Sequence, residues 1–178
     1  MALDARVRLF CALRLPDDAL DRLVAWQAVH VAGARAVDRA NLHLTLAFLG
    51  SRPETDVPGI VRELAAAASE AKRIVFQAIR YRETGSVGMV VLSDESGAAA
   101  ALAVDLAGRL ERLGVYRPER RPWLPHVTVA RFRERPGLVP PPPALGRISP
   151  SDAAVYSSVL RPSGAQYSVL ESVALGGR

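Results

Sequence analysis

The amino-acid sequence predicts an α+β fold in which antiparallel strands and helices form two similar halves around a central cleft. Turn residues at 84–86 and at 161–164 each separate two strand-like segments, so two hairpins are expected. The halves look alike because each has a His-x-Thr-x strand accompanied by a long helix. The chain of 178 residues has the length of a single domain. We therefore expect one domain, 1–178, with two pseudo-symmetric lobes.

The first half is predicted to contain two strands and two helices. Pro16 ends the first strand, and the two aspartates after it suit the positive end of a helix dipole. The sequence Gly-Ser-Arg-Pro at 50–53 is expected to break the second strand. The predicted strands span 6–13 and 42–49, and the predicted helices span 17–32 and 58–70.

The second half is predicted to contain five strands and one helix. Ser93 or Asp94 can cap the helix, and Gly114 ends it. The prolines at 140–143 predict a rigid surface excursion in a long loop, 133–143. No glycine-rich phosphate loop follows the first strand, which argues against Rossmann and P-loop folds. The predicted strands span 73–81, 87–92, 124–132, 148–160 and 166–175, and the helix runs to 113.

Composition and charge favour a globular protein with an anionic partner. Apolar residues make up 49% of the chain, and the net charge of +5 comes almost entirely from arginine, since Lys72 is the one lysine. Arginine suits phosphate and stacked bases because its planar guanidinium presents several donors. A high content of Ala, Arg and Pro also follows from a GC-rich genome, so the charge agrees with an anionic partner without identifying one.

Cysteine usage and hydropathy predict a cytoplasmic protein without a membrane partner. The single Cys11 excludes an internal disulfide and a multi-cysteine metal site, in agreement with a reducing compartment. Arg6 and Arg8 interrupt the start of the chain before any long apolar stretch, unlike a signal peptide. No window approaches the length of about 20 apolar residues that spans a bilayer.

Two of the three histidines lie in the same local pattern, His43-Leu-Thr45-Leu and His126-Val-Thr128-Val. Successive side chains of a strand point to opposite faces, so each histidine shares a face with the threonine two residues later. The intervening apolar residues take the opposite face, toward the core. If the two strands meet, one cleft receives two imidazoles and two hydroxyls.

These groups can cleave a phosphodiester without a metal or another cofactor. Histidine titrates near neutral pH, so one ring can take a proton from water while the other gives one to the departing sugar oxygen. The threonine hydroxyls can bind the non-bridging phosphate oxygens. From the residues alone, either histidine can take either role.

Two other interpretations of the histidines compete with this one. A lone histidine in an apolar strand is more often a packed and hydrogen-bonded core residue, but the repeated pattern argues against this for both positions. A zinc site needs three or four ligands, and His30 is expected on a helix face, so the chain lacks a ligand set. We therefore expect no metal and no cofactor.

Extended motifs around both histidines resemble one family over most of the chain. The family is the RNA 2′,3′-cyclic phosphodiesterases, also called 2′-5′ RNA ligases, within the two-histidine (2H) phosphoesterase superfamily, whose signature is the HxTx motif. The segments that carry the resemblance are 8–16, 41–50, 121–131 and 156–160, followed by Gly164 and Tyr167.

The resemblance implies a bilobal 2H phosphoesterase-like fold, with two antiparallel sheets, outer helices and a central cleft. It implies that His43 is the general acid and His126 the general base, with Thr45 and Thr128 holding the phosphate. The implied reaction opens a 2′,3′-cyclic phosphate at an RNA 3′ end to leave a 2′-phosphomonoester, with reversible 2′-5′ ligation as a side activity. The partner is then an RNA or oligonucleotide with such an end, and we expect a monomer.

Two further residues are candidates for substrate binding. Arg131 lies five residues after His126, and this odd spacing turns it away from the histidine unless a bulge or the strand end restores it. The alternative is a solvated arginine. Phe48 can stack a terminal base, or it belongs to the core. The resemblance is weakest in the loop 133–143, which bears on substrate preference.

Two alternative functions remain open from the sequence. One is a cyclic phosphodiesterase that acts on small nucleotides or on ADP-ribose cyclic phosphate. The other is a non-catalytic module that binds RNA ends in the same cleft.

Overall fold

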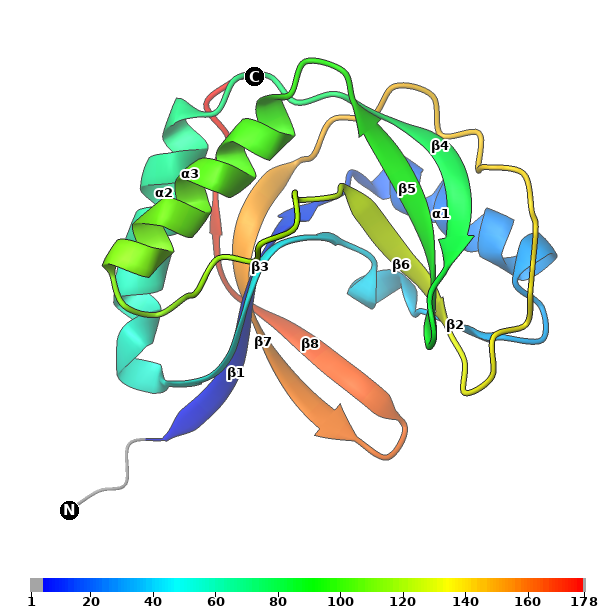
Figure 1. The fold of residues 1–178 in the computed structure, drawn as a ribbon, viewed down its shortest axis with the longest axis horizontal. Coiled ribbons are helices and arrows are strands. Elements are labelled where there is room, and N and C mark those ends of the chain that lie inside the picture. The colour runs from blue at the N-terminus through cyan, green and yellow to red at the C-terminus, as the bar shows by residue number, and fades with distance from the viewer. Residues whose placement is uncertain (1–4, 178) are drawn as a thin grey trace.

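The computed structural model describes residues 5–177 as two four-stranded antiparallel sheets with three α-helices, which confirms the predicted α+β class (Figure 1). The first sheet has the order β3-β1-β7-β8, and the second has the order β2-β6-β5-β4. The strands of the first sheet are β1 (Arg6–Arg14), β3 (Leu44–Pro53), β7 (Asp152–Arg161) and β8 (Gly164–Val173). Those of the second are β2 (Arg35–Ala36), β4 (Phe76–Glu83), β5 (Val87–Asp94) and β6 (His126–Arg131).

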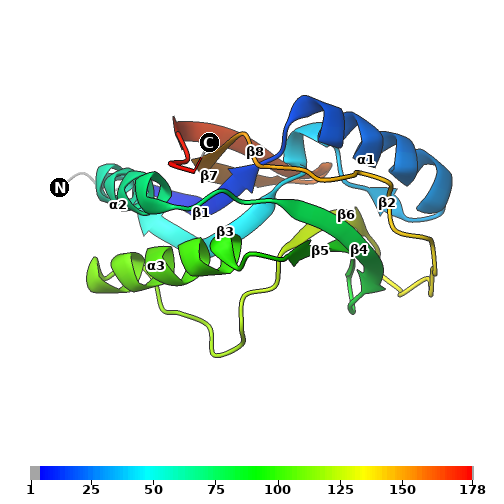
Figure 2. The same cartoon turned by 90° about the horizontal axis from the view of Figure 1, so that it is seen from above.

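The helices divide between the two sheets. α2 (Val57–Glu70) and α3 (Ala98–Arg112) lie side by side against the first sheet, and α1 (Asp17–His30) lies beside the second (Figures 1 and 2). Two short 3₁₀ turns, Arg39–Asn41 and Glu54–Asp56, precede β3 and α2. None of the helices among residues 5–177 has the length and apolar character needed to cross a membrane. A continuous buried cluster joins apolar residues of both sheets with those of all three helices.

The elements that differ from the predictions include β3, β7 and β2. β3 does not end at residue 49: it continues to Pro53 and pairs with the start of β1. This is possible because Gly50 adopts a positive φ of 70° and because β3 is an edge strand, where a proline need not donate to a neighbour. The strand predicted from residue 148 begins only at Asp152, since Ile148 forms a single bridge with Phe76. β2 was not predicted, because two residues carry no periodic pattern.

The loop 133–143 is held against the second sheet by the carboxylate of Glu83. This side chain is only 2% exposed and accepts hydrogen bonds from the backbone N–H groups of Gly137 and Leu138 at 2.9 Å. It also pairs with Arg135 at 3.3 Å. Burial alone would raise the pKa of Glu83, but these donors together with the Tyr81 hydroxyl lower it below its usual value. The Glu83 carboxylate thus accepts the hydrogen bonds of two backbone N–H groups in an otherwise irregular loop.

Substitution of Glu83 by glutamine should destabilise the fold. The variant keeps the shape of the side chain but removes the charge that these donors face, so the free energy of unfolding should fall by about 1.5–3 kcal/mol. Urea denaturation measures the change. Glu134→Gln, in the same loop and exposed, should stay within about 0.5 kcal/mol of the parent. Equal midpoints for the two variants would show that Glu83 does not anchor the loop.

Candidate active site

A β-bulge in β3 determines which side chains face the cleft. His43 immediately precedes this strand, and Thr45 lies on the same face. Cys11 pairs with Ala47 whereas Ala12 pairs with Thr45, so Leu46 is the extra residue of the bulge. The bulge reverses the alternation, and Phe48 returns to the face of Thr45.

β6 carries a bulge at the same distance from its histidine. Met89 pairs with Thr128 and Gly88 pairs with Ala130, which leaves Val129 as the extra residue. Arg131 therefore shares a face with Thr128 although it lies at an odd spacing from His126. The bulge that the prediction for Arg131 requires is present. In both strands the bulge falls three residues after the histidine, and a cleft-facing side chain follows at the fifth.

The bulge in β6 is held by a buried glutamine of α1. The Gln27 side-chain amide, 4% exposed, donates to the carbonyl oxygen of Val129 at 2.8 Å and to that of Val37 at 3.0 Å. The backbone N–H of Val37 donates to the same Val129 oxygen at 2.9 Å. The sequence indicates this role of Gln27 in one way only, because the glutamine falls on the apolar face of the helix. In β3, the carbonyl of Thr45 accepts a hydrogen bond from the Trp123 indole at 2.9 Å.

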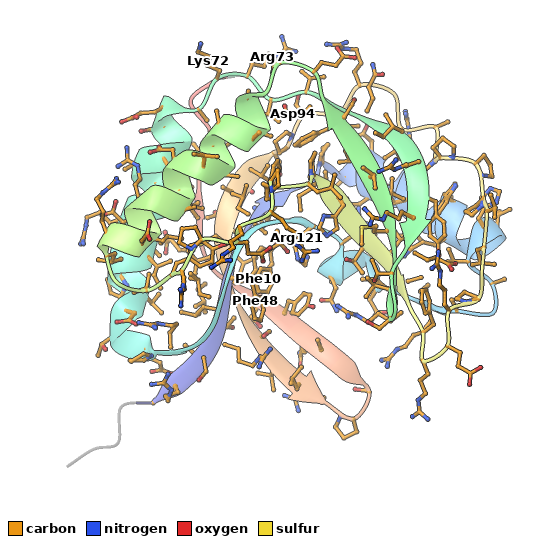
Figure 3. All side chains as sticks on the ribbon, viewed as in Figure 1. Phe10, Phe48, Lys72, Arg73, Asp94 and Arg121 are labelled. Carbon is orange, nitrogen blue, oxygen red and sulfur yellow. The ribbon has the colours of Figure 1, made fainter. Side chains whose placement is uncertain are left out.

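The two bulged strands line a cleft of about 810 Å³ between the sheets. Figure 3 shows Phe10 and Phe48 close together beside this space. Five of the six predicted site residues line the cleft: His43, Thr45, Phe48, Thr128 and Arg131. His126 does not lie on the lining, but it interacts electrostatically with His43. Phe48 is 52% exposed and does not belong to the core.

The charge of the cleft is positive. Four arginines line it, and within the described part of the chain they face a single lining carboxylate, that of Asp38. The arginines are Arg8, Arg35, Arg131 and Arg161. None of the residues 133–143 lines the cleft, so the loop in which the family resemblance is weakest lies away from it. Within residues 5–177, no group of three or more His, Cys, Asp or Glu side chains could hold a metal ion.

Both histidine rings are oriented by a backbone carbonyl two residues earlier. His43 Nδ1 lies 2.8 Å from the carbonyl oxygen of Asn41, and His126 Nδ1 lies 2.8 Å from that of Leu124. A carbonyl only accepts, so each Nδ1 carries the hydrogen. The remaining nitrogen, Nε2, is therefore the one that can exchange a proton. For His43 it lies 3.0 Å from the Thr45 hydroxyl, which donates to it when the ring is neutral.

The environment of His43 favours the neutral ring. The ring stacks on Phe10 with a centroid separation of 4.8 Å and meets Tyr167 edge-on. The pKa of His43 is lowered to about 4, mainly by burial and to a lesser degree by the electrostatic influence of His126 and Arg131, and the bond to the Asn41 carbonyl offsets only part of this. At neutral pH the ring therefore accepts a proton at Nε2 only when a negative charge is brought close to it.

Comparisons with known proteins agree with this geometry. The family model described as the 2′-5′ RNA ligase superfamily matches residues 15–156. An RNA 2′,3′-cyclic phosphodiesterase of Thermus thermophilus is 31% identical over 96% of this chain and 91% of its own length. One from Escherichia coli is 26% identical over 94% of this chain and 96% of its own length.

Solved structures have the same fold. A crystal structure of a Thermus thermophilus protein superposes with a TM-score of 0.80 at 30% identity, covering 96% of this chain and 98% of that chain. The crystal structure of Escherichia coli LigT complexed with 3′-AMP also superposes with a TM-score of 0.80, at 23% identity, and the match covers 96% of this chain and 99% of that chain. The fold and the two His-x-Thr strands, one from each sheet, define the class as a two-histidine phosphoesterase. Within it, the chain belongs to the 2′-5′ RNA ligase superfamily.

Loss of the Gln27 amide should disturb both stability and activity. Gln27→Leu leaves the buried carbonyls of Val129 and Val37 with fewer donors, which costs about 1–3 kcal/mol of unfolding free energy. If the bulge relaxes, Arg131 turns from the cleft and kcat/KM falls as well. Denaturation and turnover are measured together. Gln77→Leu, in β4, is the control, because this glutamine does not line the cleft. Unchanged stability and turnover in Gln27→Leu would contradict the assignment.

His43 should make stability depend on pH below neutrality. Its folded pKa of about 4 lies below the ordinary value of 6.5, so the unfolded chain takes up this proton first as the pH falls. Stability from the neutral ring is full above pH 6.5 and is lost as the pH falls through 4. The loss amounts to about 3 kcal/mol at most.

The measurement is the unfolding free energy of the parent and of His43→Asn between about pH 7 and pH 4, the window that the lowered pKa of His43 defines. The difference between the two should change over this window. A difference that is constant with pH would show that His43 titrates normally in the folded protein.

Proposed function

We propose that this chain is a metal-independent phosphodiesterase that opens 2′,3′-cyclic phosphate at RNA 3′ ends to leave a 2′-phosphomonoester. The observation that carries the proposal is the meeting of two His-x-Thr strands at one arginine-lined cleft, with both histidines oriented to use Nε2. The relatives named RNA 2′,3′-cyclic phosphodiesterase support the substrate.

His126 acts as the general base and His43 as the general acid. Neutral His126 takes a proton from water at Nε2, and the water oxygen attacks phosphorus. The bond from phosphorus to the 3′ oxygen breaks, and His43 gives its Nε2 proton to that oxygen. Thr45, Thr128 and Arg131 bind the non-bridging oxygens, where negative charge is held in the transition state.

Substrate binding favours protonation of His43, and the proton comes from solvent. The cyclic phosphate carries a negative charge, which raises the pKa of His43 from its low value. Once Nε2 is protonated, it no longer accepts from the Thr45 hydroxyl. That hydroxyl then turns to a phosphate oxygen, so protonation of the acid and capture of the phosphate occur together.

The remaining features of the proposal follow from the same site. One chain supplies both histidines and both threonines, which supports a monomer. A buried core that runs through both sheets supports one domain, 1–178, with two pseudo-symmetric lobes. Cys11 is buried and forms no disulfide, in keeping with a cytoplasmic location. The reverse reaction, joining an end to a 2′-phosphodiester, is expected as a minor activity because the same groups serve both directions.

Alanine at either histidine should abolish most turnover. With an oligonucleotide that ends in 2′,3′-cyclic phosphate and with EDTA present, His43→Ala or His126→Ala should reduce kcat by about 100- to 10,000-fold, because each removes one proton transfer. Chromatography of the 2′-phosphate product gives the rate. His30→Ala, at the end of α1, should retain the parental rate.

The same assay decides among the alternatives. Tight binding of the end without turnover by the parent would indicate a binding module. Faster turnover of mononucleotide or ADP-ribose cyclic phosphates than of oligonucleotides would indicate a small-molecule phosphodiesterase. Near-parental rates in either histidine variant would exclude the mechanism given above.

A further inference from the structure

Arg8 lies on the cleft wall and has no role in the mechanism above. It shares the cleft-facing side of β1 with Phe10, and it lines the cleft. Its guanidinium carbon lies 5.5 Å from the centroid of the Phe48 ring, an arrangement typical of a cation–π contact. Among residues 5–177 it forms no ion pair. Its charge is therefore available to an anion.

The other cleft arginines occupy different parts of the cleft wall. Arg161 donates to the Gln166 side chain at 2.7 Å. Arg35 lies so close over Gly164 that a Cβ there would collide with its guanidinium, which places it against the β7–β8 hairpin. Arg131 lines the cleft on the same face of β6 as Thr128, which places it near the expected position of the reacting phosphate.

The position of Arg8 fits the next phosphate along a nucleotide strand. Phe10 stacks on His43, so it marks the reacting end of the cleft. Arg8 lies two residues before Phe10 on β1, which corresponds to a separation of about 7 Å at the usual rise of a strand. This is comparable to the distance between successive phosphates of a single strand. Phe48 pairs with Phe10 across β1 and β3, and the Arg8 guanidinium lies over its ring.

We propose that Arg8 binds the phosphodiester on the 5′ side of the terminal nucleoside and so makes the cleft selective for oligonucleotides over mononucleotides. The proposal rests on the proposed function and names the part of the substrate that the histidines do not touch. On binding, the guanidinium moves from the Phe48 ring to the phosphate. The exposed ring face is then available to the terminal base.

Three substrates isolate this phosphate. They are adenosine 2′,3′-cyclic phosphate, the dinucleotide ApA with the same cyclic end, and that dinucleotide with an uncharged methylphosphonate linkage. The parent should hydrolyse the charged dinucleotide with a kcat/KM about tenfold above that of the methylphosphonate, mainly through KM. Arg8→Gln should lose this tenfold advantage and leave the other two substrates unchanged. Arg8→Lys, which keeps the charge, should retain part of it.

Arg6→Gln is the matched control. Arg6 lies two residues before Arg8 on the same strand, but its guanidinium is bonded to Ser51 and it does not line the cleft. All three rates should therefore stay at parental values. The proposal is overturned if Arg8→Gln slows all three substrates equally, since Arg8 then serves the terminal nucleoside, or if it slows none.

Failure of the proposed function gives a different result. If the parent turns over none of the three substrates, the proposed activity is wrong, and titration calorimetry with the charged dinucleotide then tests Arg8 alone. A loss of affinity in Arg8→Gln of about tenfold, absent with the methylphosphonate, supports the contact, and equal affinities for parent and variant refute it.

Discussion

The candidate site depends on two β-bulges, each placed three residues after a histidine. In a regular strand, a side chain five residues beyond the histidine would point into the core. The extra residues, Leu46 and Val129, are instead the ones that pack there, with exposures of 5% and 0%. Phe48 and Arg131 are thereby turned to the cleft. A bulge disrupts the regular ladder of hydrogen bonds, and the two donors on the Val129 carbonyl help to satisfy it in β6.

Hydrogen bonds between segments that are distant in the sequence hold the walls of the cleft in register. On one side, the Trp123 indole, just ahead of β6, bonds the carbonyl of Thr45 in β3. On another side, the Asn41 side chain donates to the carbonyl of Ala165 at 3.0 Å. The Asn41 carbonyl in turn orients His43, so one residue serves both purposes. Catalytic groups fixed by hydrogen bonds before substrate arrives lose little freedom on binding, which is the basis of preorganisation.

Much of this arrangement could be predicted from the sequence, because strands, helices and hairpin turns follow from local patterns. The two His-x-Thr segments stand out as a repeat of residue types. Features that depend on distant partners could not be predicted. The strand β2 exists only because Arg131 and Ala130 offer it an edge. The need for Gln27 arises only once the bulge in β6 exposes a carbonyl to it. The odd spacing of Arg131 indicated that a bulge was needed, but not where it would fall.

The low pKa of His43 is at first sight at odds with a role as general acid, yet the surroundings of the ring resolve the conflict. The same features that disfavour the charged ring, burial among aromatics and the nearby charge of Arg131, make a bound phosphate stabilising. A cation in a poorly hydrated site gains more from an added anion than one in water does. In the proposed mechanism, proton uptake by His43 is thus coupled to the presence of substrate. If the proposed arginine contacts form, binding energy from arginines remote from the reacting bond contributes to protonation of His43, and this links recognition of the strand to catalysis at its end.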